Sequence, residues 1–249
     1  MAALCLGLLA LSTATATAQV PDVRIAAASD LQAALPELVA RFRKETGLNV
    51  QPTFGSSGNF FTQIQNGAPF DLFLSADIDY PRRLHAAGFG EPVVPYGTGR
   101  LVLWTRNDSG VDVSRGLSVV ADPRVRRIAI ANPGYAPYGR AAVAALRAQR
   151  LYEKVEARLV LGENIAQTAQ FAQSGNAEVG IIALALVGSP VLKDSGKYVV
   201  IPSSLHPPIE QGAIVLKSAR NTAAARRFVA FLTRADTVEY LKRAGFDAP

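Results

Sequence analysis

The segment Arg24-Ile25-Ala26-Ala27-Ala28-Ser29-Asp30-Leu31 decides the fold. Its first part is apolar with small side chains, which is typical of a buried strand whose neighbours approach closely. Ser29 and Asp30 are common N-cap residues, and an apolar pattern with helical spacing follows them, so a helix is predicted to start here. The free amides and positive dipole end of such a helix can hold an anion, although many strand–helix junctions carry a cap and no ligand.

The same order of strand, small residues and helix start returns along the chain. A strand is predicted over residues 48–54, and the Gly- and Ser-rich segment 55–59 leads into a helix predicted from Phe60. A third strand over residues 69–74 ends in another Ser/Asp turn. Alternating strands and helices are typical of a parallel α/β lobe with right-handed crossovers.

Hydroxyl and acidic residues follow these predicted strands. In parallel sheets, ligands bind beyond the carboxyl ends of the strands, so we expect Ser29, Ser57 and Asp77 at one edge of the sheet. Glycine-rich loops that enter helices often hold phosphate-like groups. No Lys follows the glycines as it does in a P-loop, so the pattern gives little support to nucleotide binding.

A second lobe is predicted after a Pro- and Gly-rich stretch. The strand over residues 99–106 is interpreted as the crossing into it, and the strand over 127–131 is followed by a helix with Tyr138 at its N-terminus. The alternative for Tyr138 is an aromatic residue at the surface or at the interface between the lobes. A strand over residues 212–216 is expected to pair near the crossing strand and lead back to the first lobe.

Composition limits the classes of protein. Of the 249 residues, 49% are hydrophobic, which suffices for a core and excludes a disordered chain. The net charge of +6 comes from scattered basic residues, so no run suits nucleic acid. His85 and His206 lie far apart and outside the junction motifs.

The N-terminal 18 residues read as a signal peptide. An apolar, uncharged run is followed by small residues ending Ala16-Thr17-Ala18, which fits an A-x-A cleavage site. A membrane anchor needs about 20 apolar residues, and this run is about half that length. The single cysteine, Cys5, lies within this peptide, so the mature chain can occupy an oxidising compartment without disulfides.

In combination, the junction motifs resemble the family of periplasmic molybdate-binding proteins of ABC transporters. The resemblance spans nearly the whole mature chain, in order. The segments that carry it are AAAS at 26–29, FGSSG at 54–58, NGAPFDLFLSAD at 66–77, and NP at 132–133 with APYG at 136–139. The G-A-P-x-D-x-F-x-S-A-D pattern is the most specific of them, and we expect it to hold its lobe together.

This resemblance implies a type II solute-binding fold of two α/β lobes with a hinge and a central cleft. We expect lobe I over residues 19–97 and 208–249 and lobe II over 98–207, with the lobes closing around the crossing strands when ligand binds. The implied partners are molybdate or tungstate and an inner-membrane ABC permease, and the implied protein is a periplasmic monomer, not an enzyme. It would have no cofactor and no catalytic residues.

The resemblance also implies the ligand-binding residues. Ser29 and Ser57 would donate from lobe I, and Tyr138 and the Ile165 amide from lobe II, all to the oxygens of molybdate with no direct coordination of molybdenum. Some relatives carry a tyrosine where this chain has Ala183, and Tyr138 is expected to supply that phenol.

The chemistry of the anion fits such a site. Molybdate is a dianion without a proton, so a pocket of donors suits it, whereas protonated phosphate would leave its proton unpaired at a cost of about 1–3 kcal/mol. Sulfate would be excluded by its size. Asp30 does not fit this pattern of donors. As an N-cap, its carboxylate would point along the helix, away from the ligand. If the carboxylate faced the cleft, it would repel a dianion and favour a protonated oxyanion.

Two alternatives remain open from the sequence. The first is a binder of another tetrahedral oxyanion, such as sulfate, phosphate or chromate. The second is a secreted α/β hydrolase, which would need a nucleophile with a base in reach. No histidine lies in the junction motifs, and no serine sits in a G-x-S-x-G elbow.

Overall fold

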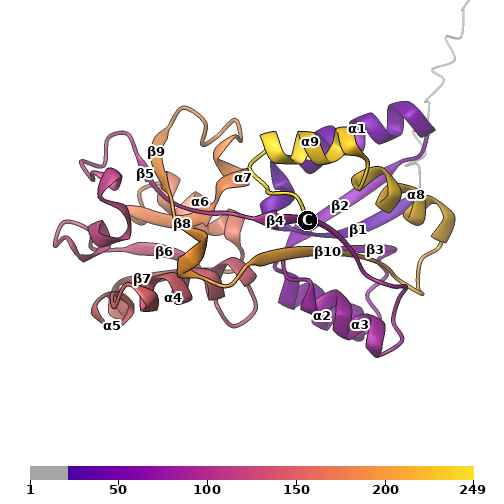
Figure 1. Cartoon of the computed structure of the whole chain (residues 1–249), viewed down its shortest axis with the longest axis horizontal. Coiled ribbons are helices and arrows are strands. Elements are labelled where there is room, and N and C mark those ends of the chain that lie inside the picture. The colour runs from indigo at the N-terminus through magenta and orange to yellow at the C-terminus, as the bar shows by residue number, and fades with distance from the viewer. Residues whose placement is uncertain (1–21) are drawn as a thin grey trace, which may run out of the picture.

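Two five-stranded sheets form the two halves of the molecule (Figure 1). The computed structural model describes residues 22–249, so the predicted signal peptide lies outside the described residues. We call the body built on the first sheet lobe I and the body built on the second lobe II. The two-lobed α/β fold of a type II solute-binding protein is confirmed.

Lobe I takes its strands from both ends of the described chain, in the order β2-β1-β3-β10-β4. β1 pairs in parallel with β2 and β3, while β10 pairs antiparallel with β3 and β4. Its elements are β1 Val23–Ala28, the 3₁₀ helix η1 Ser29–Gln32, α1 Leu35–Thr46, β2 Val50–Gly55, α2 Ser57–Gln65, β3 Leu72–Ser75, α3 Asp79–Ala86, β4 Val94–Gly99, β10 Ile209–Val215, α8 Thr222–Leu232 and α9 Ala235–Arg243.

Lobe II has the strand order β7-β6-β8-β5-β9. β6 pairs in parallel with β7 and β8, and β5 pairs antiparallel with β8 and β9. Its elements are β5 Leu101–Arg106, the 3₁₀ helix η2 Val113–Ala121, β6 Ile128–Ala131, α4 Pro137–Ala148, α5 Tyr152–Val155, η3 Glu156–Arg158, β7 Leu159–Gly162, α6 Ile165–Gln173, β8 Val179–Ala183, α7 Leu184–Val187, β9 Gly196–Val200 and η4 Ser203–Leu205.

The chain passes between the lobes through neighbouring strands. β4 leads at Arg100 into β5, and the segment after β9 leads back into β10, which pairs with β4 (Figure 1). The prediction that the returning strand pairs near residues 101–104 was wrong, because β10 bonds to β3 and β4 within lobe I. β5, the strand that follows the crossing, pairs with β8 and β9 in lobe II instead.

The core of lobe I explains why its C-terminal helices return to it. The buried face of α1 carries Leu35, Leu38 and Phe42 at helical spacing, and Gly47 ends the helix with φ +75°. The ring of Phe42 meets that of Phe228 on α8 edge to face, with centroids 5.0 Å apart. α8 therefore covers the same side of the sheet as α1.

The segment 66–77 ties lobe I together through its acidic residue Asp71, as expected. Asp71 accepts from the Nε and Nη2 of Arg24, both at 2.9 Å, and from the backbone amides of Arg24 and Arg220 at 2.7 and 2.8 Å. Its side chain is 1% exposed. These bonds join β1, the start of β3 and the segment before α8.

Candidate functional site: a closed pocket between the lobes

Strand ends and helix starts from both lobes line one small pocket. It has a cavity volume of about 10 Å3 and is lined by Ala28, Ser29, Asp30, Gly55, Ser56, Ser57, Ala76, Ala136, Pro137, Tyr138 and Ile165. All four predicted ligand-binding residues are in this lining. Asp77 is not, although its neighbour Ala76 is. The pocket thus lies beyond the carboxyl ends of parallel strands in both sheets.

Ser29 follows β1 directly, but neither it nor Asp30 caps a helix. The first helical turn is the 3₁₀ helix Ser29–Gln32, whose N-cap position is Ala28 and has no side-chain cap. The α-helix begins only at Leu35. The predicted N-cap role was therefore wrong, because the sharp 3₁₀ turn draws both side chains into the interior. Within residues 22–249, no hydrogen bond is found to the Ser29 hydroxyl, which leaves it available to a ligand.

Ser57 is the first residue of α2, which begins three residues earlier than predicted. The extension comes from Ser56, whose side chain accepts from the Asn59 amide and caps the helix. The Ser57 oxygen accepts from the Ala76 amide at 3.0 Å, and the residue is fully buried. Its hydroxyl proton and its first-turn amide remain free to donate into the pocket.

Tyr138 is the second residue of α4, after Pro137 at the first position. The close approach of this helix to its strand requires Gly139, where any Cβ would clash with the Ala131 carbonyl oxygen. The Tyr138 amide belongs to the first turn and has no intrahelical acceptor. The phenol extends to lobe I, where its hydroxyl donates to Oδ2 of Asp30 at 2.9 Å.

Ile165 is the first residue of α6. The side chain of Asn164 caps this helix by accepting from the amides of Ala166 and Gln167, both at 3.0 Å. The Ile165 amide is the one that the cap leaves unused at this end. An Asn directly before an apolar helical run is a signal that sequence analysis can read.

A buried polar cluster surrounds Asp30 in the wall of the pocket. The carboxyl is fully buried, and Oδ2 accepts from both the Tyr138 hydroxyl and Nε2 of Gln211 on β10. Among the described residues, neither Asp30 Oδ1 nor Gln211 Oε1 has a partner. Burial raises the pKa of Asp30 to about 6, against the opposing effect of the bonds from Gln211 and Tyr138.

Gln211 is a member of this cluster that the sequence did not predict. It lies in a strand, IEQGAIV, that is otherwise apolar except for one exposed Glu, and it is fully buried. A polar side chain inside such a strand must find a partner, and this is the signal that was available. Burial, and next the charge of Asp30, also raise the pKa of Tyr96 on β4 well above its usual value.

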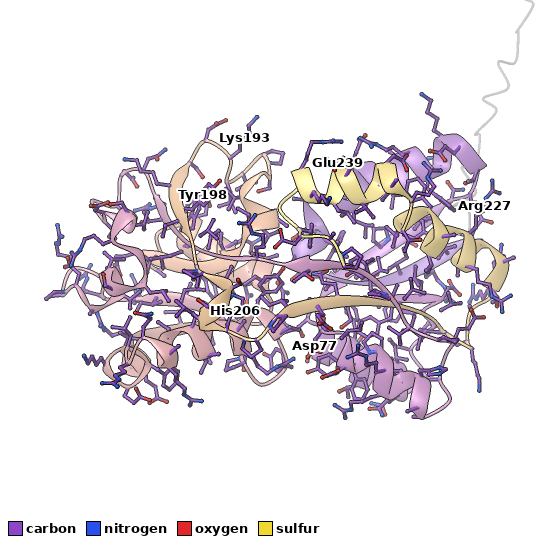
Figure 2. The ribbon with its side chains drawn as sticks, in the orientation of Figure 1. Asp77, Lys193, Tyr198, His206, Arg227 and Glu239 are labelled. Carbon is purple, nitrogen blue, oxygen red and sulfur yellow. The ribbon has the colours of Figure 1, made fainter. Side chains whose placement is uncertain are left out.

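Direct contacts join the lobes around the pocket. The Gly58 amide of α2 donates to the Tyr135 carbonyl at 2.9 Å. Arg140 of α4 pairs with Asp77 and donates to the Tyr80 hydroxyl at 3.2 Å. Asp77 lies near the centre of the molecule, where the lobes meet (Figure 2). The structure therefore shows the lobes in contact, with the pocket between them.

The pocket contains no cationic side chain among its described lining residues. Its lining, taken from residues 22–249, includes no Lys, Arg or His, and Asp30 and Tyr138 are its only ionisable side chains. Helix and 3₁₀ starts at Ser29, Ser57, Tyr138 and Ile165 supply amides and the positive ends of peptide dipoles. Such donors can hold an anion without a cation.

A larger groove lies elsewhere between the lobes. It runs past α7 and α9, with Arg100, Lys193, Tyr198 and Lys242 in its lining. Lys193 and Tyr198 lie on lobe II, and Glu239 lies on α9 of lobe I (Figure 2). The groove is larger than the small pocket, and its lining does not include the helix starts at Ser29, Ser57, Tyr138 and Ile165. The small pocket is the better candidate for a compact ion.

Neither a metal-binding cluster nor a membrane-spanning helix is found among the described residues. Over the described part of the chain, the structure holds no cluster of three or more His, Cys, Asp or Glu side chains able to coordinate a metal ion. Over the same residues, no helix combines the length and apolar character needed to cross a bilayer.

A fold of two α/β lobes with a small enclosed pocket between them defines a solute-binding protein. The chain matches the family model described as bacterial extracellular solute-binding protein over residues 23–247, and it belongs to this family.

Individual relatives narrow the comparison from this family to molybdate-binding proteins. It is 37% identical to the molybdate-binding protein ModA of Rhodobacter capsulatus, over 90% of this chain and 88% of that protein. It is also 37% identical to ModA of Azotobacter vinelandii, over 92% and 91%. The solved structure of the Azotobacter vinelandii periplasmic molybdate-binding protein superposes with a TM-score of 0.85 at 34% identity, covering 91% of this chain and 99% of that one. The predicted resemblance is confirmed.

Proposed function

We propose that this protein captures molybdate, and also tungstate, in the pocket between its lobes and delivers it to an ABC permease of the inner membrane. The observation that carries the proposal is that four helix starts, two from each lobe, line one enclosed pocket without a cation. The names of the relatives, molybdate-binding proteins from two bacteria, support the choice of ligand. The ligand is cargo, and the proposal includes no cofactor and no enzymatic activity.

Each predicted residue has a role in this proposal. Ser29 and Ser57 donate through their hydroxyls and amides from lobe I. Tyr138 and Ile165 donate through amides from lobe II. These groups contact oxygens of the anion, and none coordinates molybdenum. In this structure the Tyr138 hydroxyl donates its hydrogen bond to Asp30. To donate to the anion, as predicted, the hydroxyl must give up this bond and turn toward the pocket.

Asp30 favours a second candidate. An ionised carboxylate in the lining is an acceptor, which suits a singly protonated oxyanion such as hydrogen phosphate better than a proton-free dianion. The donors of the helix starts would serve either anion. Sulfate is a proton-free dianion too, and it is distinguished from molybdate by its smaller size.

Export and delivery complete the proposal. We place the protein in the periplasm as a monomer, exported by the signal peptide at residues 1–18. The boundaries are proposed as residues 19–97 with 208–249 for lobe I and 98–207 for lobe II.

We further propose that ligand binding closes the lobes by a hinge at the two crossings between them. Small-angle scattering should then show a more compact particle when molybdate is added, and an unchanged particle would count against the hinge.

Calorimetry tests the ligand. Titration with molybdate or tungstate should give submicromolar binding, and titration with sulfate or phosphate should give none. Ser57→Ala should weaken molybdate binding about tenfold or more, because one buried hydrogen bond to a charged group contributes roughly 1.5–3 kcal/mol. Ser203→Ala, at an exposed position of η4, is the matched control and should bind like the parent. Binding of phosphate in preference to molybdate would establish the second candidate.

A further inference from the structure

Asp30 presents a charge problem that the proposed function does not solve. Its carboxyl is fully buried in the lining of the pocket that would receive a dianion. One oxygen, Oδ2, has two donors, and the other has none among the described residues. An ionised Asp30 beside a bound dianion would put three negative charges in one enclosed space, where like charges strongly disfavour ionisation.

The surroundings of Asp30 offer no compensating cation. α6, α7 and β2, which pack on η1, contain no ionisable side chain. α1 carries Glu37 and Arg41, which pair with each other at the surface, and exposed Arg43, Lys44 and Glu45, of which Glu45 pairs with Arg234. β1 carries Arg24, which is paired with Asp71. Across the pocket, Tyr138 of α4 faces Asp30, and within lobe I the charge of Asp30 acts on Tyr96 of β4. Both phenols are neutral. Gln211 of β10 is a neutral donor.

We propose that Asp30 takes up one proton from solvent when the oxyanion binds, so that the lobes close on a neutral carboxylic acid. This inference rests on the proposed function, since it concerns a proton-free dianion in this pocket. In this proposal Asp30 is a positioning residue that gains a proton as the anion binds. A neutral Asp30 does not favour a protonated anion, as an ionised carboxylate would.

Protonation also changes what Tyr138 can do. With Asp30 ionised, the phenol must donate to Oδ2 because the carboxylate has no proton of its own. A neutral Asp30 can donate to the phenol oxygen, and the phenol proton is then free to turn toward the anion. One proton from solvent thereby removes a repulsive charge and adds a donor to the pocket.

Calorimetry in buffers of different ionisation enthalpy measures the proton directly. With inorganic molybdate at pH 7, the parent protein should take up most of one proton, because its empty pocket holds Asp30 mostly ionised. Between pH 7 and pH 8 its affinity should fall about tenfold. Asp30→Asn should show no proton uptake and a flat pH profile, while Asp79→Asn, an exposed carboxyl on α3, should match the parent.

Infrared difference spectra give a second readout that does not depend on the variant folding. Addition of molybdate to the parent protein should produce the carbonyl band of a protonated carboxylic acid, and Asp30→Asn should lack it. Binding without proton uptake, without that band and without a pH slope would overturn the inference while leaving the proposed function intact. The absence of molybdate binding at every pH would instead overturn the proposed function, and phosphate binding without proton uptake would show that Asp30 stays ionised.

Discussion

Gly99 and the Tyr138 hydroxyl are in direct contact at the crossing between the lobes: a Cβ built on Gly99 would clash with Oη and lie 2.8 Å from Cζ of Tyr138. Gly99 is the last residue of β4, and Tyr138 belongs to lobe II. Any side chain at position 99 must therefore displace the phenol that donates to Asp30. The fit at this point joins β4, the strand that leads into lobe II, to the wall of the pocket.

Gly99→Ala should weaken molybdate binding roughly ten- to hundredfold, since overpacking a buried site costs about 1–3 kcal/mol. Calorimetry measures the affinity, and thermal melting of the unliganded protein measures how much of the loss is general destabilisation. Gly97→Ala is the matched control in the same strand, because its Cβ would meet nothing closer than 3.4 Å. Equal affinities for the two variants would show that the Gly99 contact does not matter.

Gly58→Ala should hinder closure of the lobes. The added Cβ would lie 2.6 Å from the Tyr135 carbonyl oxygen, which accepts the Gly58 amide across the cleft. We expect molybdate affinity to fall at least tenfold, with little change in the stability of the unliganded protein, because α2 itself tolerates Ala.

The control for this change is Gly188→Ala, whose Cβ would have no neighbour within 4 Å. Scattering with and without molybdate should show compaction for the control and a smaller change for Gly58→Ala. Full compaction and full affinity of Gly58→Ala would mean that the closed state does not need this contact.

Asp71→Asn should destabilise lobe I by about 3 kcal/mol at pH 7, because it breaks a buried ion pair and leaves Arg24 without its partner. Burial opposes ionisation of Asp71, but its bonds from Arg24 and the Arg220 amide outweigh burial, and its pKa lies below the usual 3.8. The ion pair therefore contributes fully above about pH 4, and its contribution is lost as pH falls through the lowered pKa.

Urea unfolding of Asp71→Asn and the parent at pH 7 and at about pH 3 checks this pH dependence, and the difference between them should shrink at the lower pH. Asp79→Asn removes an exposed carboxyl paired with Arg82 and should cost less than about 1 kcal/mol. A constant difference across pH would contradict the assigned role of the ion pair.

Asp30 should have the opposite pH dependence in the unliganded protein. Burial raises its pKa to about 6 from 3.8, so the folded state holds the proton more tightly than the unfolded state does. Stability should fall as pH rises through this window, by up to about 3 kcal/mol. Asp30→Asn lacks this cost, so its stability relative to the parent should improve between pH 4 and pH 7 in urea unfolding. A pH-independent difference would show that Asp30 ionises as readily in the folded protein as in the unfolded chain.

Local sequence signals and the resemblance to molybdate-binding proteins together led to the candidate pocket. Ser29, Ser57 and Tyr138 lie in the first turns of helices or 3₁₀ helices that follow strands, and short-range chemistry sets such junctions: small residues, hydroxyl and amide caps, and apolar periodicity. Ile165, the first residue of α6, was implied by the resemblance. The same signals placed the start of α2 three residues late, because the Ser56 cap was not recognised. They also assigned a capping role to Asp30, because a 3₁₀ turn and a capped α-helix share the same residue types at their first positions.

The sequence by itself determined the alternation of strands and helices, the two-lobed α/β class and the residues at the junctions, because hydrophobic period and end chemistry act over a few neighbouring residues. Only the tertiary structure decided that β10 pairs with β4, that Gln211 and Tyr138 converge on Asp30, and that the pocket contains a buried carboxyl. The residues that make these contacts are 73 to 181 positions apart in the sequence, so the contacts depend on how the strands and the lobes pack.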